Sequence, residues 1–100
     1  MTIASQLLTQ AKLHARIDGN DEDAAMVLML EAALADVCHA AGIAVPATLA
    51  ELTADLRFAV IDQAAMLYDA RGAAQRPAGL SMAASRITAR RRGVSLGAAQ

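Results

Sequence analysis

The stretch N-D-E-D-A-A-M-V-L-M-L-E-A-A-L-A-D-V-C-H-A-A-G, residues 20–42, decides the fold class. It opens with acidic residues, which are favourable at the positive end of a helix dipole, and Asn20 or Asp21 can serve as the N-cap. It closes at Gly42, a residue typical of the position just after a helix. Between these ends, one face collects apolar residues at helical spacing: Met26, Val27, Leu30, Leu34, Val37 and Ala41. The stretch therefore predicts one long amphipathic helix.

Two bulky apolar residues of this stretch do not fit the apolar face. At 100° per residue, Leu28 and Met29 project to the far side, near Asp36 and His39. Large apolar side chains opposite a core face need a second surface to cover them. We therefore expect this helix to be covered on both sides.

Helical spacing also dominates on either side of this stretch. Thr2 is a plausible N-cap for a helix over residues 3–16. The pair Thr48 and Glu51 matches a capping box that opens the next helix, which can start anywhere from Thr48 to Thr53 and ends near residue 71. After a link at 72–79, Ser81 caps a short helix to about residue 91, anchored by Met82 and Ile87. The sequence predicts an all-α fold: a small bundle of about four helices with a mobile C-terminal arm. We divide the chain into a helical core, 1–78, and a short helix with a docking tail, 79–100.

The third predicted helix is apolar on two sides. Its first face holds Leu52, Leu56, Val60, Gln63 and Leu67, and a nearly opposite face holds Phe58, Ile61, Ala65 and Tyr68. A third, acidic edge repeats every seven residues, at Asp55, Asp62 and Asp69. Such a helix belongs in the middle of a bundle or between subunits. A four-helix monomer, whose middle helix touches the three others, is the alternative to a subunit contact.

Composition and charge favour association. Of the 100 residues 26 are alanine and two are aromatic, so we expect the few large apolar side chains to do nearly all the packing. Residues 18–69 carry a charge of −9 and residues 70–100 a charge of +6, although the chain as a whole carries only −1. Opposed charges at two ends of a chain suit head-to-tail association of copies. The alternative is a C-terminal arm that folds back on the acidic face of its own chain.

Residues that would carry chemistry are few and scattered. Cys38 is the single cysteine, and we expect it to be a small buried residue. His14 and His39 have no partner at ligand spacing, and the acidic loop after Asp18 lacks the spacing of a calcium loop. No nucleotide-binding or nucleophile motif occurs. We therefore predict no enzyme, no metal and no cofactor. No signal peptide or membrane span is expected either, since acidic residues interrupt every apolar run.

The arginines near the C-terminus are the strongest local signal. Arg86 and Arg90 lie one helical turn apart, and Arg91 and Arg92 follow. Such a group can neutralise phosphates, so a small helical DNA-binding or regulatory protein is the alternative function. The group lacks interleaved aromatic residues, which favours docking on an acidic protein surface. A generic helical scaffold, stable as a dimer, is a third possibility.

The order of these features resembles the head–tail connector (adaptor) family of long-tailed phages and prophages. The resemblance spans about residues 7–92, and its ordering carries more weight than any single motif. The matching segments are A-K-L-H-A-R-I-D (11–18), D-E-D (21–23), E-A-A (31–33), L-R-F-A-V (56–60) and M-L-Y-D-A-R (66–71). The chain departs from the family pattern at Ala15, where Leu is usual, and at Asp69, where Glu is frequent.

This resemblance implies a structural protein of the virion, made in the host cytoplasm, with no active site and no cofactor. It implies a ring, dodecameric by expectation, beneath the portal protein. The ring would bridge the portal to a neck or tail-terminator protein and surround genomic DNA that passes without sequence-specific binding. Our candidates for the subunit interface are Leu28, Met29, Phe58, Ile61, Tyr68, Asp55, Asp62 and Asp69. Our candidates for portal or DNA-channel contact are Arg71, Arg76, Arg86, Arg90, Arg91 and Arg92.

Overall fold

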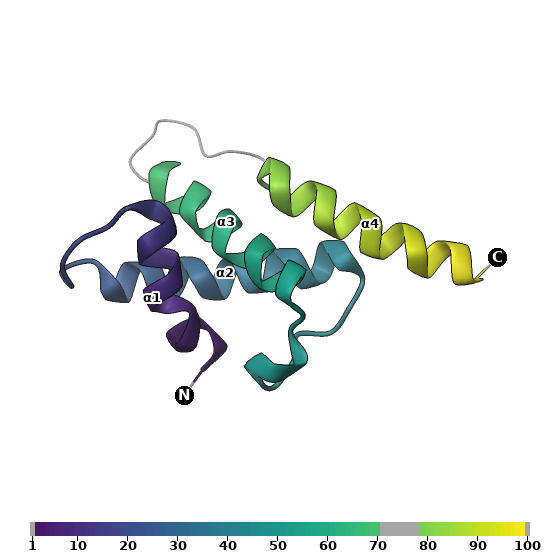
Figure 1. Ribbon diagram of the computed structural model, residues 1–100, viewed down its shortest axis with the longest axis horizontal. Helices are drawn as coiled ribbons and strands as arrows, with labels where there is room; N and C mark the ends of the chain where they lie inside the picture. The colour runs from purple at the N-terminus through teal and green to yellow at the C-terminus, as the bar shows by residue number, and fades with distance from the viewer. Residues whose placement is uncertain (1, 71–78, 100) are drawn as a thin grey trace.

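Four α-helices make up most of the part of the chain that the structure describes. The computed structural model describes residues 2–70 and 79–99, with side chains as far as Arg91 (Figure 1). The helices are α1 (Ile3–Ala15), α2 (Asp23–Ala41), α3 (Ala54–Ala70) and α4 (Met82–Ala99), and a 3-10 turn, η1 (Leu49–Glu51), precedes α3. The described part of the chain holds no strand. The predicted all-α bundle of four helices is confirmed, while residues 72–78 of the predicted link at 72–79 lie outside the described residues.

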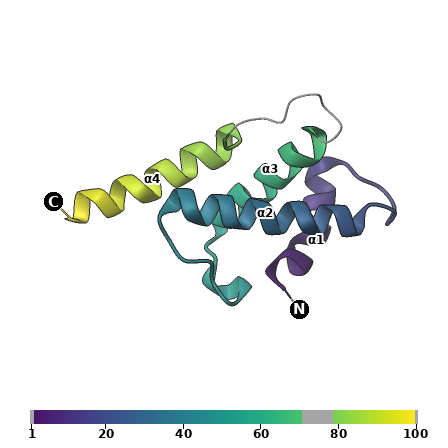
Figure 2. The same cartoon turned by 180° about the vertical axis from the view of Figure 1, so that it is seen from behind.

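The helices form a flat body with α2 and α3 at its centre. These two helices pack against each other, and α1 and α4 each pack on both of them at opposite ends (Figures 1 and 2). The body measures 48 × 32 × 17 Å. Since packed helices lie about 8–10 Å apart, the short dimension has room for two helix layers and not for three. A helix in either layer therefore keeps one side open to solvent, unless another molecule covers it.

Several helices begin or end at the capping residues that the sequence predicts. The Thr2 side chain accepts a hydrogen bond from the backbone N–H of Ser5 (3.1 Å), as the predicted cap requires. Gly42 ends α2 with φ +74°, a conformation that costs glycine little because it has no Cβ. The Ser81 hydroxyl accepts from the N–H of Ala84 (3.2 Å), which confirms the predicted start of the last helix.

Two predicted caps are wrong. The N-cap of α2 is Glu22, which makes no capping bond with its side chain, rather than Asn20 or Asp21. The Asn20 amide oxygen instead accepts a hydrogen bond from the Lys12 ammonium (3.0 Å), which also pairs with Asp23 at 2.8 Å and so joins the end of α1 to the start of α2.

The expected capping box at Thr48 and Glu51 does not form either. Thr48 makes no capping bond with its side chain, and the residues after it form η1. The Arg57 guanidinium holds this turn by donating to the backbone oxygens of Leu49 (3.1 Å) and Leu52 (2.9 Å). A basic side chain one turn into α3 thus gives the Leu52 carbonyl a donor and gives the Leu49 carbonyl a second one, beside the backbone N–H of Leu52 (3.0 Å).

Alanine contributes more to the core than the composition suggested. Among the residues whose burial the structure describes, eight of the 20 buried apolar ones are alanines, so the expectation that large side chains do nearly all the packing is wrong. Small residues let helices approach closely, and the larger side chains fill the space that remains. Six of those larger residues are almost fully buried: Leu7, Met26, Leu30, Leu52, Val37 and Val60.

The last helix is fixed to the core by a buried polar contact. Gln63 of α3 is 1% exposed, and its Oε1 accepts a hydrogen bond from the backbone N–H of Ser81 (2.6 Å). Ala84 and Ile87 of α4 are buried in the same core, whereas Met82, which the sequence analysis expected to be an anchor, is 72% exposed. The helix also continues to Ala99 rather than ending near residue 91. Gly93 and Gly97 weaken a helix without breaking it, because neither removes a backbone hydrogen bond.

Candidate functional site

The outer side of α3 brings the predicted aromatic and acidic residues together. Phe58 is 46% exposed, and its ring meets the His14 ring of α1 edge to face, with centroids 5.8 Å apart. The His14 Nε2 lies 3.0 Å from a carboxylate oxygen of Asp62, one turn beyond Phe58. The sequence placed Phe58 and Asp62 on different edges of the helix, but they are only about 40° apart around its axis. His14 had no apparent partner in the sequence because its partner comes from another helix.

A shallow groove continues from this cluster. It has a volume of about 530 Å³ and lies between the end of α1, the outer side of α3 and the start of α4. Its lining residues are His14, Ala15, Arg16, Asp62, Ala65, Met66, Asp69, Ser81 and Met82. Its lining contains both polar and apolar side chains, and its two acids, Asp62 and Asp69, come from the predicted acidic edge. The groove is therefore a mixed surface that suits a protein contact.

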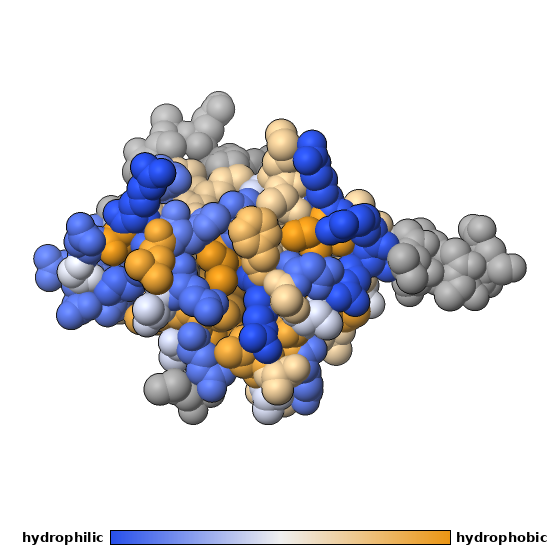
Figure 3. Space-filling view, viewed as in Figure 1, coloured by the Kyte–Doolittle hydropathy of each residue, from blue (hydrophilic) through white to orange (hydrophobic). Residues whose placement is uncertain are grey.

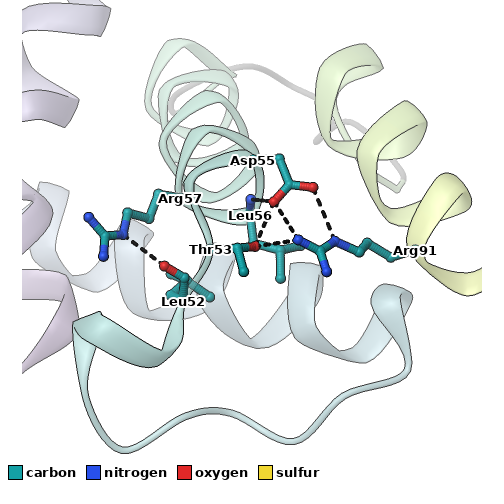
Figure 4. A network of polar contacts seen from close by, with 6 residues as sticks. All are labelled: Leu52, Thr53, Asp55, Leu56, Arg57 and Arg91. Atoms are coloured by element: carbon teal, nitrogen blue, oxygen red, sulfur yellow. Dashed lines mark hydrogen bonds and ion pairs between the residues drawn. The ribbon is translucent and has the colours of Figure 1, made fainter.

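The third acid of that edge is occupied within the chain. Asp55 binds the guanidinium of Arg91 through two hydrogen bonds, of 2.7 and 3.1 Å (Figure 4). Arg91 also donates to the Thr53 hydroxyl (2.6 Å), which in turn donates to the Asp55 carboxylate (2.6 Å). The Arg91 hydrogen bond, followed by that of Thr53, holds the pKa of Asp55 well below its ordinary value, and the same ion pair raises the pKa of Arg91. At this point the C-terminal helix does fold back on the acidic face of its own chain.

The other arginines differ from Arg91. Arg86 and Arg90 are exposed on α4, and neither forms an ion pair with any residue that the structure describes. Arg71 and Arg76 lie outside the described residues, and so does the side chain of Arg92. Figure 3 shows strongly hydrophilic side chains over the middle of α4 on the face with α1, α3 and α4 in front. Two predicted contact arginines thus remain available to another molecule.

The outer side of α2 is a helix face on which no other described helix packs (Figure 2). Leu28 is 67% exposed, as predicted, whereas Met29 is partly buried against the core, contrary to expectation. By length and composition α2 could cross a membrane: its mean hydropathy over 18 residues is 1.6, and 39% of that window is buried. In the folded chain it is a central helix that packs on the other three. It is thus a core helix with a large apolar residue, Leu28, on its exposed side.

Two other predicted interface residues are covered by their own chain. Ile61 is 8% exposed and belongs to the core, and Tyr68 is partly buried against it. The packing of α3 on α1, α2 and α4 produces this burial, as in the four-helix alternative. Phe58 is the member of that face that keeps a large exposed area.

The described residues offer little for covalent or metal chemistry. Among them, no three His, Cys, Asp or Glu side chains gather to hold a metal ion. Cys38 is 1% exposed, and burial raises the pKa of its thiol, which disfavours the reactive thiolate. His39 and Asp36 line a second hollow, of about 310 Å³, beside Gly79 and Leu80. The exposed features are mainly helix faces and charges, which mark a small helical protein built for contact with other macromolecules.

Comparison with known protein families identifies the family to which this small helical protein belongs. The family model described as "Phage gp6-like head-tail connector protein" matches residues 5–88, from the first turn of α1 into α4. The chain therefore belongs to the phage gp6-like head–tail connector family, a family of structural components of the virion. The resemblance found in the sequence is confirmed. Searches among curated proteins and among solved structures returned no match.

Proposed function

We propose that the chain is one subunit of a ring at the head–tail junction of a tailed phage. The ring is seated beneath the portal, bridges it to the next neck or tail-terminator protein, and surrounds the channel through which DNA passes. The observation that carries this proposal is the family match over residues 5–88. The protein acts by binding its neighbours and catalyses no reaction.

The surface of the folded chain supports an assembling role. Leu13, Leu28, Phe58 and Met82 are large apolar residues that are 46–75% exposed, and they come from all four helices. Exposed apolar side chains next to unpaired charges are typical of surfaces that another protein covers. In this proposal Leu28 and Phe58 contact other subunits together with Met29, Tyr68 and the acidic edge of α3. The arginines of α4 face the portal, the DNA channel or a neighbouring copy.

Imaging of purified phage particles tests this function directly. We expect a ring of copies of this chain at the neck, in contact with the portal, and particles lacking the chain should fail to join heads to tails. A neck without the chain, or joined particles in its absence, would overturn the proposal.

A DNA-binding function is the second candidate, because Arg86 and Arg90 are exposed and unpaired among the described residues. Titration of the protein with duplex DNA at two salt concentrations separates the two functions. Phosphate contacts release counterions, so tight binding that falls steeply with salt would favour DNA binding as the main role. We expect only weak binding, because Arg91 is already held by Asp55.

A further inference from the structure

We infer that the outer face of α2 in one copy of this chain packs against the outer face of α4 in the next copy. This inference rests on the proposed function in that it names the contact through which subunits join. The two faces belong to different parts of the surface, so each copy uses both of them, one toward each neighbour.

The outer face of α2 is apolar along its middle and acidic along its sides. Its exposed residues are Ala24, Leu28, Glu31, Ala32, Ala35, Asp36 and His39. The two acids stand on opposite sides of the line from Leu28 to Ala35. Neither Glu31 nor Asp36 forms an ion pair with a described residue. Figure 2 shows α2 in front of the other helices with nothing over it.

The outer face of α4 has the same construction with the opposite charge. Its exposed residues are Met82, Ser85, Arg86, Ala89 and Arg90. The inner face, with Ala84, Ile87 and Thr88, is buried against the body. The clamp between Arg91 and Asp55 fixes the rotation of the helix and so holds Arg86 and Arg90 outward.

The two faces match in shape and in charge. Small side chains at Ala32 and Ala35, and at Ser85 and Ala89, let two helices approach closely, while Leu28 and Met82 fill the space beside them. Two unpaired acids on one face meet two unpaired arginines on the other. The acids along the outer edge of α3 are poorer partners, since Asp55 is already bound to Arg91 and Asp62 lies against His14. That edge therefore offers a single exposed acid, Asp69, where the outer face of α2 offers two.

Other occupants of the α2 face fit less well. Nucleic acid would be repelled by Glu31 and Asp36, because both lie on the face itself. A bilayer would have to accept the same two carboxylates beside Leu28, at a cost that an apolar anchor avoids. A second α2 would bring like charges together. The outer face of α4, which is basic and carries small residues, is the surface in the described part of the chain that best complements the α2 face.

The contact is heterologous, because a face of one kind meets a face of another kind. Repeated from copy to copy, such a contact closes into a ring or continues as a filament. One helix pair is also a small interface, so isolated copies are expected to associate weakly and to gain stability from closure of the ring.

Two charge-reversed variants test the pairing. One carries Glu31→Arg and Asp36→Arg on α2, and the other carries Arg86→Glu and Arg90→Glu on α4. Each variant alone presents like charges on its two faces, so self-association measured by sedimentation should weaken on the order of tenfold or more. An equimolar mixture restores opposite charges at every contact and should associate about as well as the wild type. Asp18→Arg with Asp21→Arg, on the loop before α2, is the control with the same charge change.

Disulfide trapping tests the geometry even if association is brief. A chain with Ala32→Cys mixed with a chain with Ala89→Cys should give a mixed disulfide dimer under mild oxidation of concentrated protein. Neither variant alone should give more than a trace. Circular dichroism verifies that each variant is folded. Failure of the mixture to cross-link, or charge reversals that leave association as in the wild type, would overturn the inference.

These measurements are separable from the test of the proposed function. If a ring is seen at the neck but the charge-reversed variants associate like the wild type, the inferred α2–α4 contact is wrong and the connector function still holds. If the mixture of variants associates but the phage particle contains no copy of the chain, the connector function is wrong and the α2–α4 contact still holds. Wild-type protein that binds lipid vesicles, and loses this binding on Leu28→Asp, would assign the α2 face to a bilayer and overturn the inference.

Discussion

Replacing Gln63 with alanine should loosen the last helix from the body. Gln63 is 1% exposed, and its Oε1 accepts a 2.6 Å hydrogen bond from the backbone N–H of Ser81, which is itself 7% exposed. A weaker contact at 3.4 Å joins its Nε2 to the oxygen of Gly79. The variant leaves the N–H of Ser81 without its acceptor at the point where α4 begins.

The magnitude follows from what is lost. A buried donor left without a partner costs about 1–3 kcal/mol. Removal of the buried aliphatic stem of the glutamine adds roughly 1 kcal/mol, and the higher helix propensity of alanine returns a few tenths of a kcal/mol. We therefore expect a net loss of about 2–3 kcal/mol in the free energy of unfolding. This is a large share of the roughly 5–15 kcal/mol typical of a domain.

Urea unfolding followed by circular dichroism measures this loss. With a slope of about 1–3 kcal/mol per molar urea, the midpoint should fall by roughly 0.7–3 M. Gln10→Ala, an exposed glutamine on α1, is the matched control and should change stability by less than about 0.5 kcal/mol. Hydrogen exchange should accelerate in α4 more than in α1. If Gln63→Ala unfolds at the same urea concentration as the control, the buried contact does not hold α4.

Three further changes probe the core, the ion pair and a helix end. Leu30→Ala, at a residue 0% exposed, should cost about 2–5 kcal/mol, whereas Leu28→Ala on the same helix should change thermal stability little, since that side chain is 67% exposed. Asp55→Asn should cost no more than about 1 kcal/mol at neutral pH, because the ion pair with Arg91 is partly exposed. Since the folded pKa of Asp55 is lowered, this contribution is present above the unfolded value of about 3.9, and urea titrations should show it disappearing as the pH falls below that value. Gly42→Ala should cost about 1 kcal/mol, because its φ of +74° strains any side chain although no atom lies within 4 Å of the added Cβ; an unchanged unfolding midpoint would contradict this account.

Much of the helical framework was predictable because the signals that set it are local. The apolar spacing of residues 20–42, the cap at Thr2, the glycine at Gly42 and the serine at Ser81 each act within a turn or two of chain. Prediction failed at the start of α2, where two possible partners compete for the same side chain. Asn20 could have capped α2, but Lys12 from the preceding helix takes its side-chain oxygen.

The candidate site was predictable only in part. The exposure of Leu28 and the availability of Arg86 and Arg90 followed from helical position. The burial of Ile61 and the ion pair between Arg91 and Asp55 could not be predicted in this way. Each depends on which helix packs against the residue in the folded chain.

The residue pattern along the chain is enough to predict an all-helical fold with opposed charges and more apolar helix surface than its length suggests, and the order of its motifs indicates the connector family. Which of those surfaces the chain's own helices cover follows from the way the helices pack in three dimensions. Helix formation depends on bonds four residues apart, so it can be read along the chain. The pairing of Arg91 with Asp55, of His14 with Asp62 and of Gln63 with Ser81 depends on how the helices rotate and cross. Those angles are set by the packing of the whole core at once.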